Sequence, residues 1–388
     1  MKSISINAIG PITQGTVDFG DLTLFVGSHA SGKGITLQLI KLLVDKDHIR
    51  RTLEQYGCVW GNDTASVLDR YFGEGMSGII TDSSSVAFNG DQIKLPDWLS
   101  LKPTINSLIG DDPEQLFYVP AQRVVCLQNG WPRFFTDYED SVPYVLRHFS
   151  ETLRQYLESN SSQKTDAIFP QSDRLRSPLR DSFNDSIFHD GKIVLDRKVK
   201  KRFKLNVGNS SIPYMAWSAG QKEFMPLLLS FYWLCPDSES GRKDGIKYVI
   251  IEEPEMGLHP QAIESVILQI IDLLSRGYKI IVSTHSPVFL EFAWAFRYLQ
   301  KASAGDSYLT ELFNVKPSDE VSQLFRNTLQ NNTINTYYFD RDHDSIAVKD
   351  ISTLDAGSED LSVAEWGGLS SFSSKASDII SRVMAQEV

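Results

Sequence analysis

The sequence predicts an α/β protein whose centre is a mixed, mainly parallel β-sheet flanked by helices. Three stretches predict this class: an apolar run at 22–26 that precedes a glycine-rich turn, and two β-branched runs at 247–253 and 279–285. Continuous β-branched runs are typical of parallel strands that are covered on both faces. Residues 262–276, between the last two runs, carry apolar residues at helical spacing, which indicates a strand–helix–strand unit.

The composition is that of an ordinary globular protein and excludes several classes. The chain has 388 residues, 41% of them hydrophobic, which suffices for one large domain or two to three smaller ones. Its net charge of −11 argues against a protein built as a whole to coat nucleic acid.

The start shows no signal-peptide pattern and the longest apolar run, 224–235, is too short to span a bilayer, so we expect a cytoplasmic protein without a membrane partner. Cys58, Cys126 and Cys235 lack the spacing of metal ligands, and we expect Cys126 in the core.

The elements expected along the chain alternate between strands and helices. The residue pattern of 2–10 and 16–20 predicts a hairpin, and a helix is expected to start at about Lys33. Asn89-Gly90 is a strong hairpin-turn dipeptide. The later expected elements are a strand at 116–123, an amphipathic helix at 143–160 followed by a polar linker, a helix at 217–234, a hairpin at 335–350 and a closing helix at 373–386.

A phosphate-binding loop is indicated at 27–34, between a predicted strand and a predicted helix. The expected nucleotide-binding residues are Gly27, Ser28, His29, Ala30, Ser31, Gly32, Lys33 and Gly34. In such a loop the backbone N–H groups at the positive end of the helix cradle phosphates, and the lysine reaches the outer ones. The last position ordinarily carries a hydroxyl that binds Mg²⁺, and here it is a glycine.

Four further elements follow the loop, and each has a chemical role that requires a nucleotide bound there. Gln122 ends a predicted strand, Glu252 and Glu253 end the strand at 247–253, and His285 ends the strand at 279–285. We assign Glu252, with Gln122, to Mg²⁺, since this cation prefers oxygen ligands. Glu253 is placed to orient or deprotonate the attacking water, and His285 to hydrogen-bond the γ-phosphate or that water. The fourth element is WSAGQ at the start of a helix.

This order of elements resembles the head of ABC-type ATPases: phosphate loop, glutamine loop, signature, acidic strand and switch histidine. WSAGQ matches the family signature at Ser218, Gly220 and Gln221 and departs from it at Trp217 and Ala219. The resemblance implies an ABC-ATPase-like fold that uses ATP and Mg²⁺. In that family the signature serves the nucleotide on a second subunit, so the resemblance also implies a head-to-head homodimer or a larger even assembly.

Within this family the chain looks most like compact AAA/ABC-like proteins, which include overcoming-lysogenisation-defect ATPases and ATPases of bacterial anti-phage systems. The segments YVPAQR, SAGQKEF, EEPEMGLHP and STHSP carry this resemblance. The ending EWGGLSSFSSKASDIISR is similar to the ATPase of PARIS-type systems. Heptad arms of the SMC type are missing from the sequence, and the long segment after His285 argues against a transporter subunit.

The resemblance suggests four parts. Residues 1–140 would form the N-terminal part of the ATPase head, 141–205 a helical or irregular insertion with a basic hairpin, 206–310 the C-terminal part of the head, and 311–388 a small α/β extension. Three functions follow from it: a defence sensor or switch that controls a separate effector, a DNA-repair or DNA-processing ATPase, and a scaffold that holds ATP with little hydrolysis. For the first, we expect a nuclease as effector and a phage-derived trigger. Gly34 predicts slow hydrolysis.

Two charged segments carry alternative interpretations. Asp340, Asp342 and Asp344 could bind Mg²⁺ in a TOPRIM-type nuclease, but the upstream Glu-Gly that such a domain needs is missing, which favours an acidic hairpin turn. Residues 192–204 hold seven basic residues and one acidic residue. They are typical of a solvated hairpin, or alternatively form a contact surface for nucleic acid or an acidic partner. Arg123 and His259 are accessory candidates without an assigned role.

Overall fold

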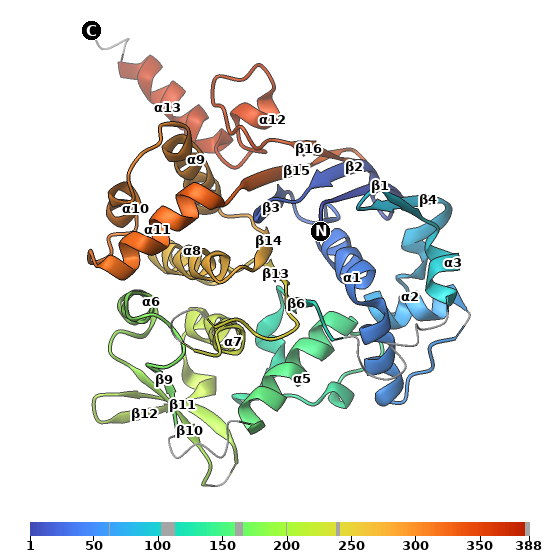
Figure 1. Cartoon of the computed structure of the whole chain (residues 1–388), viewed down its shortest axis with the longest axis horizontal. Coiled ribbons are helices and arrows are strands. Elements are labelled where there is room, and N and C mark those ends of the chain that lie inside the picture. Colours follow the sequence, from blue (N-terminus) through green and yellow to red (C-terminus); the bar gives the residue numbers. More distant parts are fainter. Residues whose placement is uncertain (62, 102–112, 160–165, 199, 238–240, 385–388) are drawn as a thin grey trace.

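A ten-stranded sheet runs through the whole molecule (Figure 1). The computed structural model describes residues 1–388 apart from 62, 102–112, 160–165, 199, 238–240 and 385–388. Most of the polar linker expected after the helix at 143–160 therefore lies outside the described residues. In sheet order the strands are β5 (Asp91–Ile93), β4 (Ile80–Phe88), β1 (Ser3–Ile9), β2 (Ile12–Asp18), β16 (Ser345–Asp350), β15 (Ile334–Asp342), β3 (Leu22–Gly27), β14 (Lys279–Ser283), β13 (Tyr248–Glu252) and β6 (Leu116–Val119).

The sheet is mixed and mainly parallel, as the sequence predicts. The five strands from β15 to β6 are parallel to one another, and β16 is parallel to β2. The pairs of β1 with β2 and with β4, of β4 with β5, and of β15 with β16 are antiparallel. The parallel half is buried on both faces, which explains the continuous apolar runs of β3 and β13.

Helices cover both faces of the sheet (Figure 1). Because successive strand residues point to opposite faces, Leu24 and Val249 join one core and Phe25 and Ile250 the other. The first core is covered by α5 (Tyr144–Ser159), α6 (Ser177–Phe183), α7 (Ala219–Leu234), α8 (Pro260–Ser275), α9 (Pro287–Lys301), α10 (Ser307–Leu312) and α11 (Asp319–Asn331). The second is covered by α1 (Lys33–Gln55), α2 (Thr64–Phe72) and α3 (Leu95–Ser100).

The short elements complete the chain. They are the turns of 3₁₀ or π-helix η1 (Ser77–Ile79), η2 (Arg123–Cys126), η3 (Phe135–Asp137), η5 (Asn184–Phe188) and η6 (Tyr214–Ala216), the two-stranded β7 (Leu127–Gln128) and β8 (Trp131–Pro132), and α12 (Leu361–Ala364). Cys126 is fully buried, as expected. Among the described residues, no helix combines the length and the apolar character that crossing a bilayer requires.

A small antiparallel sheet forms between α5 and α7. Its strands are β9 (Ala167–Phe169), β10 (Lys192–Asp196), β11 (Arg202–Val207) and β12 (Ser210–Pro213). The expected basic hairpin is its β10–β11 pair. The boundary that we place after residue 205 falls inside β11, because β12 pairs with β11 and continues the sheet. The insertion is thus partly a sheet and not only helical or irregular.

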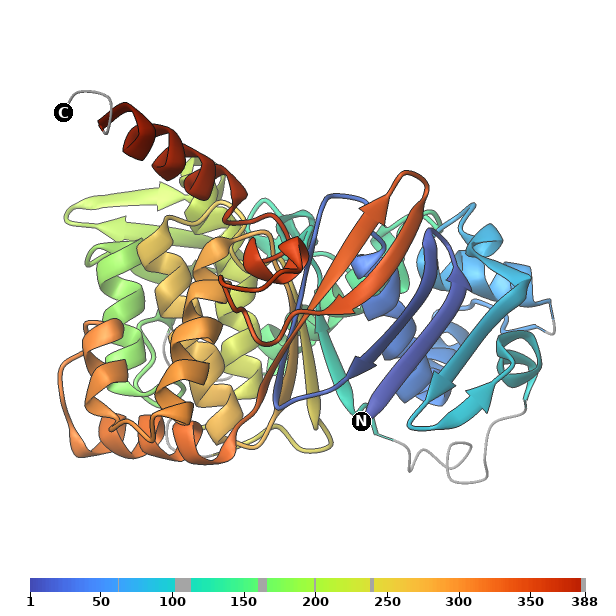
Figure 2. The same cartoon turned by 90° about the horizontal axis from the view of Figure 1, so that it is seen from above.

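The hairpin expected at 335–350 is formed by β15 and β16 and joins the central sheet. β15 lies parallel to β3, with Phe339 opposite Gly27, so the segment after residue 311 contributes two strands to the central sheet. The closing helix is α13 (Ser371–Met384), which projects from the body at the C-terminal end (Figure 2). The four-part division stays a prediction, and this hairpin lies in the main sheet.

Candidate nucleotide-binding site

Three parallel strands bring the predicted site together at one edge of the sheet. Glu252 at the end of β13 lies beside Ser283 at the end of β14, and Ser283 lies beside Phe25 near the end of β3. Open α/β sheets bind ligands at these carboxyl ends of strands. A hollow of about 120 Å³ lies there, lined by His29, Ala30, Ser31, Gly32, Lys33, Gly34, Glu252, Glu253, Ser283 and His285.

Two glycines of the loop are required by its backbone. Gly27 has a φ of 150° and Gly32 a φ of 81°, in the region that favours glycine. A Cβ at Gly27 would lie 2.8 Å from the Phe339 carbonyl oxygen, and one at Gly32 would lie 2.8 Å from Ile12. The glycine spacing read from the sequence therefore reflects close packing against β15 and β2, and it leaves the N-terminus of α1 directed at the hollow.

Lys33 is buried at the base of the loop. Its ammonium donates to the carbonyl oxygens of Gly27 and Ser28, both at 2.9 Å. Burial lowers the pKa of Lys33 to about 8, against the opposing effect of the nearby carboxylates. Because that pKa lies above 7, the side chain stays mainly protonated at neutral pH and can attract an anion.

Gly34 lies directly against Glu252. A Cβ at position 34 would be 3.1 Å from Glu252 Oε1. The absent side chain therefore leaves room for this carboxylate at the start of α1. Thr36 does not replace the missing hydroxyl, because its Oγ1 is buried and donates to the Gly32 carbonyl at 3.0 Å.

Glu252 is a partly buried acid with one backbone donor. Its Oε2 accepts from the Ala121 N–H at 3.1 Å. Burial raises the pKa of Glu252 to about 7, in spite of that donor. A cation bound beside this carboxylate would favour its ionised form. Glu252 is therefore a suitable ligand for a cation.

Glu253 and His285 face each other across the hollow. Glu253 Oε1 and His285 Nε2 lie 3.4 Å apart, and both side chains are partly exposed to solvent. Glu253 has a φ of 42°, unusual for a non-glycine residue, and its N–H donates to the Ser283 carbonyl at 2.8 Å. Burial lowers the pKa of His285, and the positive charge of the Lys33 ammonium lowers it further. The imidazole is therefore favoured in its neutral form, which can accept a proton. A carboxylate and an imidazole, side chains of the types that can take a proton from water, thus lie beside the loop at 27–34.

Glu255 is a residue whose role the sequence reasoning missed. Its Oε1 accepts from the His285 N–H at 2.6 Å and from Thr284 Oγ1 at 2.9 Å. It therefore holds the backbone of the histidine in place. The third acid of EEPE was the available signal.

Arg123, an accessory candidate to which the sequence assigned no role, is a second positioning residue. Its guanidinium is fully buried and donates to four carbonyl oxygens at 3.1–3.3 Å, those of Glu223, Glu252, Glu253 and Pro254. It joins η2 to α7 and to the end of β13. The signal in the sequence was an arginine at the polar end of the strand predicted at 116–123, but its partners are far away in the chain.

The predicted signature residues lie outside the hollow. Ser218 is the N-cap of α7 and, with Gln221, forms a capping box. Gly220 packs on the loop after β13, where an added Cβ would lie 2.7 Å from the Gly257 carbonyl oxygen. Ser218 is exposed, so it is open to a second molecule.

The remaining candidates are not brought into the hollow. Gln122 is exposed and lies directly before η2, next to the Ala121 that contacts Glu252. His259 caps α8 by accepting from the Gln261 N–H. Asp340 pairs with Lys349 at 2.7 Å across the β15–β16 hairpin, the arrangement expected of an acidic hairpin. The metal-binding role of Gln122 stays a prediction.

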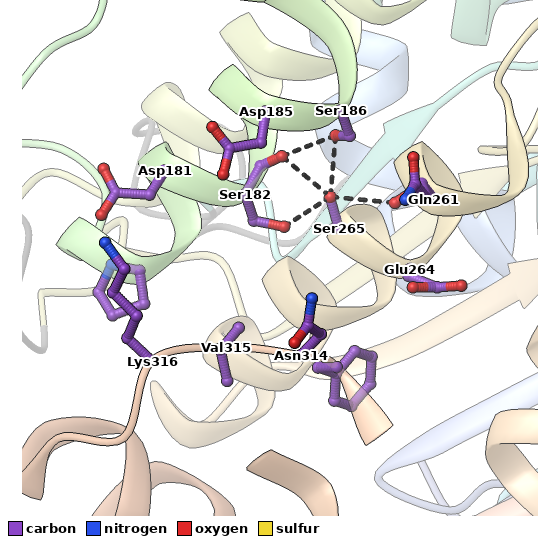
Figure 3. A pocket seen from close by; sticks show the side chains of 12 residues that line it. Asp181, Ser182, Asp185, Ser186, Gln261, Glu264, Ser265, Asn314, Val315 and Lys316 are labelled. Atoms are coloured by element: carbon purple, nitrogen blue, oxygen red, sulfur yellow. Dashed lines mark hydrogen bonds between the residues drawn. The ribbon is translucent and has the colours of Figure 1, made fainter. Parts of the chain in front are cut away.

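A separate hollow of about 260 Å³ lies between α6, η5, α8 and the loop after α10 (Figure 3). Three serines meet at its wall, with Ser265 Oγ 2.6 Å from Ser182 Oγ and 3.0 Å from Ser186 Oγ. Their hydrogen bonds join α6 and η5 to α8. These hydroxyls are therefore used within the fold, at a distance from the phosphate loop.

Comparisons with known proteins agree with this geometry. Residues 162–291 match the family described as "AAA domain, putative AbiEii toxin, Type IV TA system". The matched residues include Glu252, Glu253 and His285, so this part of the site is similar to an AAA-type ATPase domain. An 80-residue stretch is 32% identical to the Old nuclease of Escherichia phage P2 and covers 21% of this chain and 14% of that nuclease. The expected resemblance to AAA/ABC-type ATPases is confirmed at this level, whereas the PARIS-type resemblance stays a prediction.

Two solved structures are similar over most of the chain. The SMC head domain from Thermotoga maritima is 11% identical with a TM-score of 0.37, and covers 90% of this chain and 98% of that one. An SmcHead bound to the C-winged helix domain of ScpA is 10% identical with a TM-score of 0.43, and covers 90% and 96%. The assignment of an α/β fold follows from the chain's own sheet.

Proposed function

We propose that the chain is an ATP-binding ATPase that acts as a switch in bacterial anti-phage defence and controls a separate effector, for which a nuclease is the expected class. The observation that carries the ATPase assignment is the convergence of Lys33, Glu252, Glu253 and His285 on one hollow beside the phosphate loop. The similarity to an AAA domain and to a phage nuclease supports the same class.

The residues present fit the phosphates of ATP and a Mg²⁺ ion. Backbone N–H groups of the loop and Lys33 would hold the phosphates, and Glu252, with Gln122, would hold Mg²⁺ directly or through water. The ion would neutralise charge on the phosphates when bound. Glu253 would orient and deprotonate the attacking water, while His285 hydrogen-bonds that water or the γ-phosphate.

A second copy of the chain is the proposed partner at this site. The hollow of about 120 Å³ is small, since pockets that enclose a drug-sized ligand measure about 300–1,000 Å³. Ser218 and Gly220 lie outside it, on a surface that a second copy can reach. Two heads that sandwich two ATP molecules would complete both sites.

ATP turnover by the purified chain tests the enzymatic part. We expect Mg²⁺-dependent hydrolysis that falls at least tenfold in Glu253→Gln, while ATP binding is retained because the loop and Lys33 are unchanged. Glu291→Gln, an exposed acid on α9, is the matched control. Turnover that survives Glu253→Gln would contradict the assignment of the base.

Copurification with and without ATP tests the switch. An effector that leaves or joins the chain when ATP or a phage-derived trigger is added would support it, because a switch requires that ligands bind its two states with different affinity. If the amount of bound partner is the same with and without ATP and before and after phage infection, the switch is contradicted. A scaffold that holds ATP with little hydrolysis would show binding without turnover in this same pair of assays.

A DNA-processing ATPase is the alternative, and the basic hairpin β10–β11 is the segment that suggests it. Local acids already pair with several of its basic side chains: Lys204 with Asp196 at 2.8 Å, Arg197 with Asp166 at 3.0 Å, and Lys201 with Glu158 at 4.0 Å. This favours a solvated hairpin. Salt-sensitive DNA binding that is lost when Lys198, Lys200, Lys201 and Arg202 are neutralised would favour the alternative.

A further inference from the structure

Three metal-ligating side chains meet at the mouth of the phosphate loop. Ligand atoms of His29, Glu253 and His285 all lie within 4.8 Å of one another. The two imidazole rings face each other, with centroids 4.3 Å apart and planes at 33°. A phosphate loop needs its glycines and its lysine, and nothing in phosphate binding calls for a histidine at position 29.

We propose that His29, Glu253 and His285 form a binding site for a divalent transition metal such as Zn²⁺, which binds when the nucleotide is absent and blocks the ATPase centre. Two imidazoles and one carboxylate, with a fourth position open to water, are a donor set that Zn²⁺ takes in proteins. Mg²⁺ prefers oxygen ligands in octahedral geometry, so the same set selects against it. The block rests on the ATPase function proposed above, whereas metal binding does not.

The spacing of the donor atoms suits a tetrahedral ion. Zn²⁺ bonds of about 2.0–2.1 Å at tetrahedral angles place neighbouring ligand atoms roughly 3.3 Å apart. Glu253 Oε1 and His285 Nε2 already lie 3.4 Å apart. His29 is exposed on the loop, so its ring can turn to supply the third bond.

The backbone around two of the ligands is held in advance of binding. The Glu253 N–H donates to the Ser283 carbonyl at 2.8 Å, and its own carbonyl accepts from Arg123 at 3.2 Å. The His285 N–H donates to Glu255 at 2.6 Å. A site whose ligands are fixed by such supporting bonds loses less conformational freedom on binding.

The nearby ammonium of Lys33 does not occupy the Glu253 carboxylate with a hydrogen bond. The Lys33 ammonium donates to the carbonyls of Gly27 and Ser28, and not to the Glu253 carboxylate. A second group of similar composition, His48, Glu114 and His148, shows the contrast. There the Lys41 ammonium lies 2.6 Å from Glu114 Oε1 and occupies the carboxylate, so that group does not make a metal site.

Metal titration of the nucleotide-free protein tests the site. We expect one Zn²⁺ per chain by calorimetry, and the visible absorption of four-coordinate cobalt when Co²⁺ is used as the probe. His29→Ala removes one of three protein ligands and should weaken Zn²⁺ binding at least tenfold. His189→Asn, an exposed histidine on the small-sheet side, is the matched control and should bind as the parent does. Absence of binding in the parent, or equal binding in His29→Ala, overturns the site.

Inhibition separates this inference from the proposed function. In the parent, the Zn²⁺ concentration that halves ATP turnover should be at least tenfold lower than in His29→Ala, whatever the basal turnover of the variant. If the parent binds Zn²⁺ but shows no turnover, the ATPase proposal fails and the metal site stands. If turnover is present and Zn²⁺ neither binds nor inhibits, only the metal site fails.

Discussion

At the scale of single residues, the glycine at position 34 is explained by its neighbour. The loop lacks the hydroxyl that usually binds Mg²⁺, and the space is next to the Glu252 carboxylate, 3.1 Å from where a Cβ would lie. The absence of a side chain at position 34 therefore leaves room for an acid close to the start of α1. We expect ATP to bind and to be hydrolysed slowly.

Restoring the hydroxyl tests this explanation. Gly34→Ser should raise Mg²⁺-dependent turnover roughly tenfold, which corresponds to about 1.4 kcal/mol of barrier, since it supplies the missing oxygen ligand. Turnover as a function of Mg²⁺ concentration is the measurement. Gly34→Ala adds the same Cβ without the hydroxyl and should not show the gain. Unchanged turnover and Mg²⁺ dependence in Gly34→Ser would contradict the idea.

Glu252 should make stability depend on pH. Its pKa is raised to about 7, so between about pH 4.5 and 7 the folded chain binds more protons than the unfolded chain. Its contribution to the free energy of unfolding therefore falls as pH rises through this window. At about 1.36 kcal/mol per pKa unit, the loss is roughly 3 kcal/mol above pH 7.

Glu252→Gln should remove this dependence. Glutamine keeps an acceptor for the Ala121 N–H but carries no charge, so the variant should be more stable than the parent above pH 7 and similar to it near pH 4.5. Urea unfolding of both proteins from pH 4.5 to 8 is the measurement. Because other titrating groups are common to both, the difference between the two curves isolates Glu252. Parallel curves would show that its pKa is not raised.

At the scale of elements, one buried arginine couples three of them. Arg123 in η2 donates to carbonyls of α7, of the last residue of β13 and of the segment after it, and so fixes the backbone of the acids relative to α7. Such a residue acts through others and touches no nucleotide itself.

Substitution of Arg123 should separate positioning from binding. Arg123→Lys keeps the charge but loses the fork of donors, and leaves buried carbonyls unpaired at about 1–3 kcal/mol each. We expect unfolding free energy to fall by roughly 3 kcal/mol and kcat to fall at least tenfold, with ATP affinity changed less than threefold because the phosphate loop is untouched. A loss of stability with unchanged kcat would mean a purely structural role.

The start of α7 offers a prediction with an internal control. Ser218 and Ser318 are both N-caps whose hydroxyls accept from a backbone N–H, in α7 and α11 respectively. Replacing either by alanine should lower the unfolding free energy by about 1 kcal/mol. Only Ser218→Ala should also reduce ATP turnover and ATP-dependent dimerisation, if the signature serves a second copy. Equal turnover in the two variants would contradict that role.

At the scale of the whole molecule, the proposed dimer should depend on ATP. Ser218 at the start of α7 does not line the hollow, so in the proposed dimer each nucleotide would bind between the hollow of one copy and α7 of the other. Glu253→Gln retains ATP and should shift the chain from monomer to dimer when ATP is added. Mass photometry with ATP, with ADP and without nucleotide measures this. A mass that stays the same in all three conditions contradicts the sandwich.

The local features of this protein were predictable from its sequence. The apolar runs of β3 and β13, the strand-end acids and the Asn89-Gly90 hairpin each depend on a few neighbouring residues. Local sterics and periodicity determine such features. The order of these motifs along the chain was enough to expect a nucleotide site at the ends of parallel strands.

Only the tertiary structure decided how distant segments meet. It placed β15 beside β3, set Glu252 against Gly34, and gave Arg123 and Glu255 partners that the sequence does not reveal. It also brought His29 to His285 and Glu253. Strand order and side-chain packing set these contacts, and both depend on pairing between residues far apart in the chain. Periodicity identifies a strand and its buried face, whereas only the folded sheet determines its neighbours.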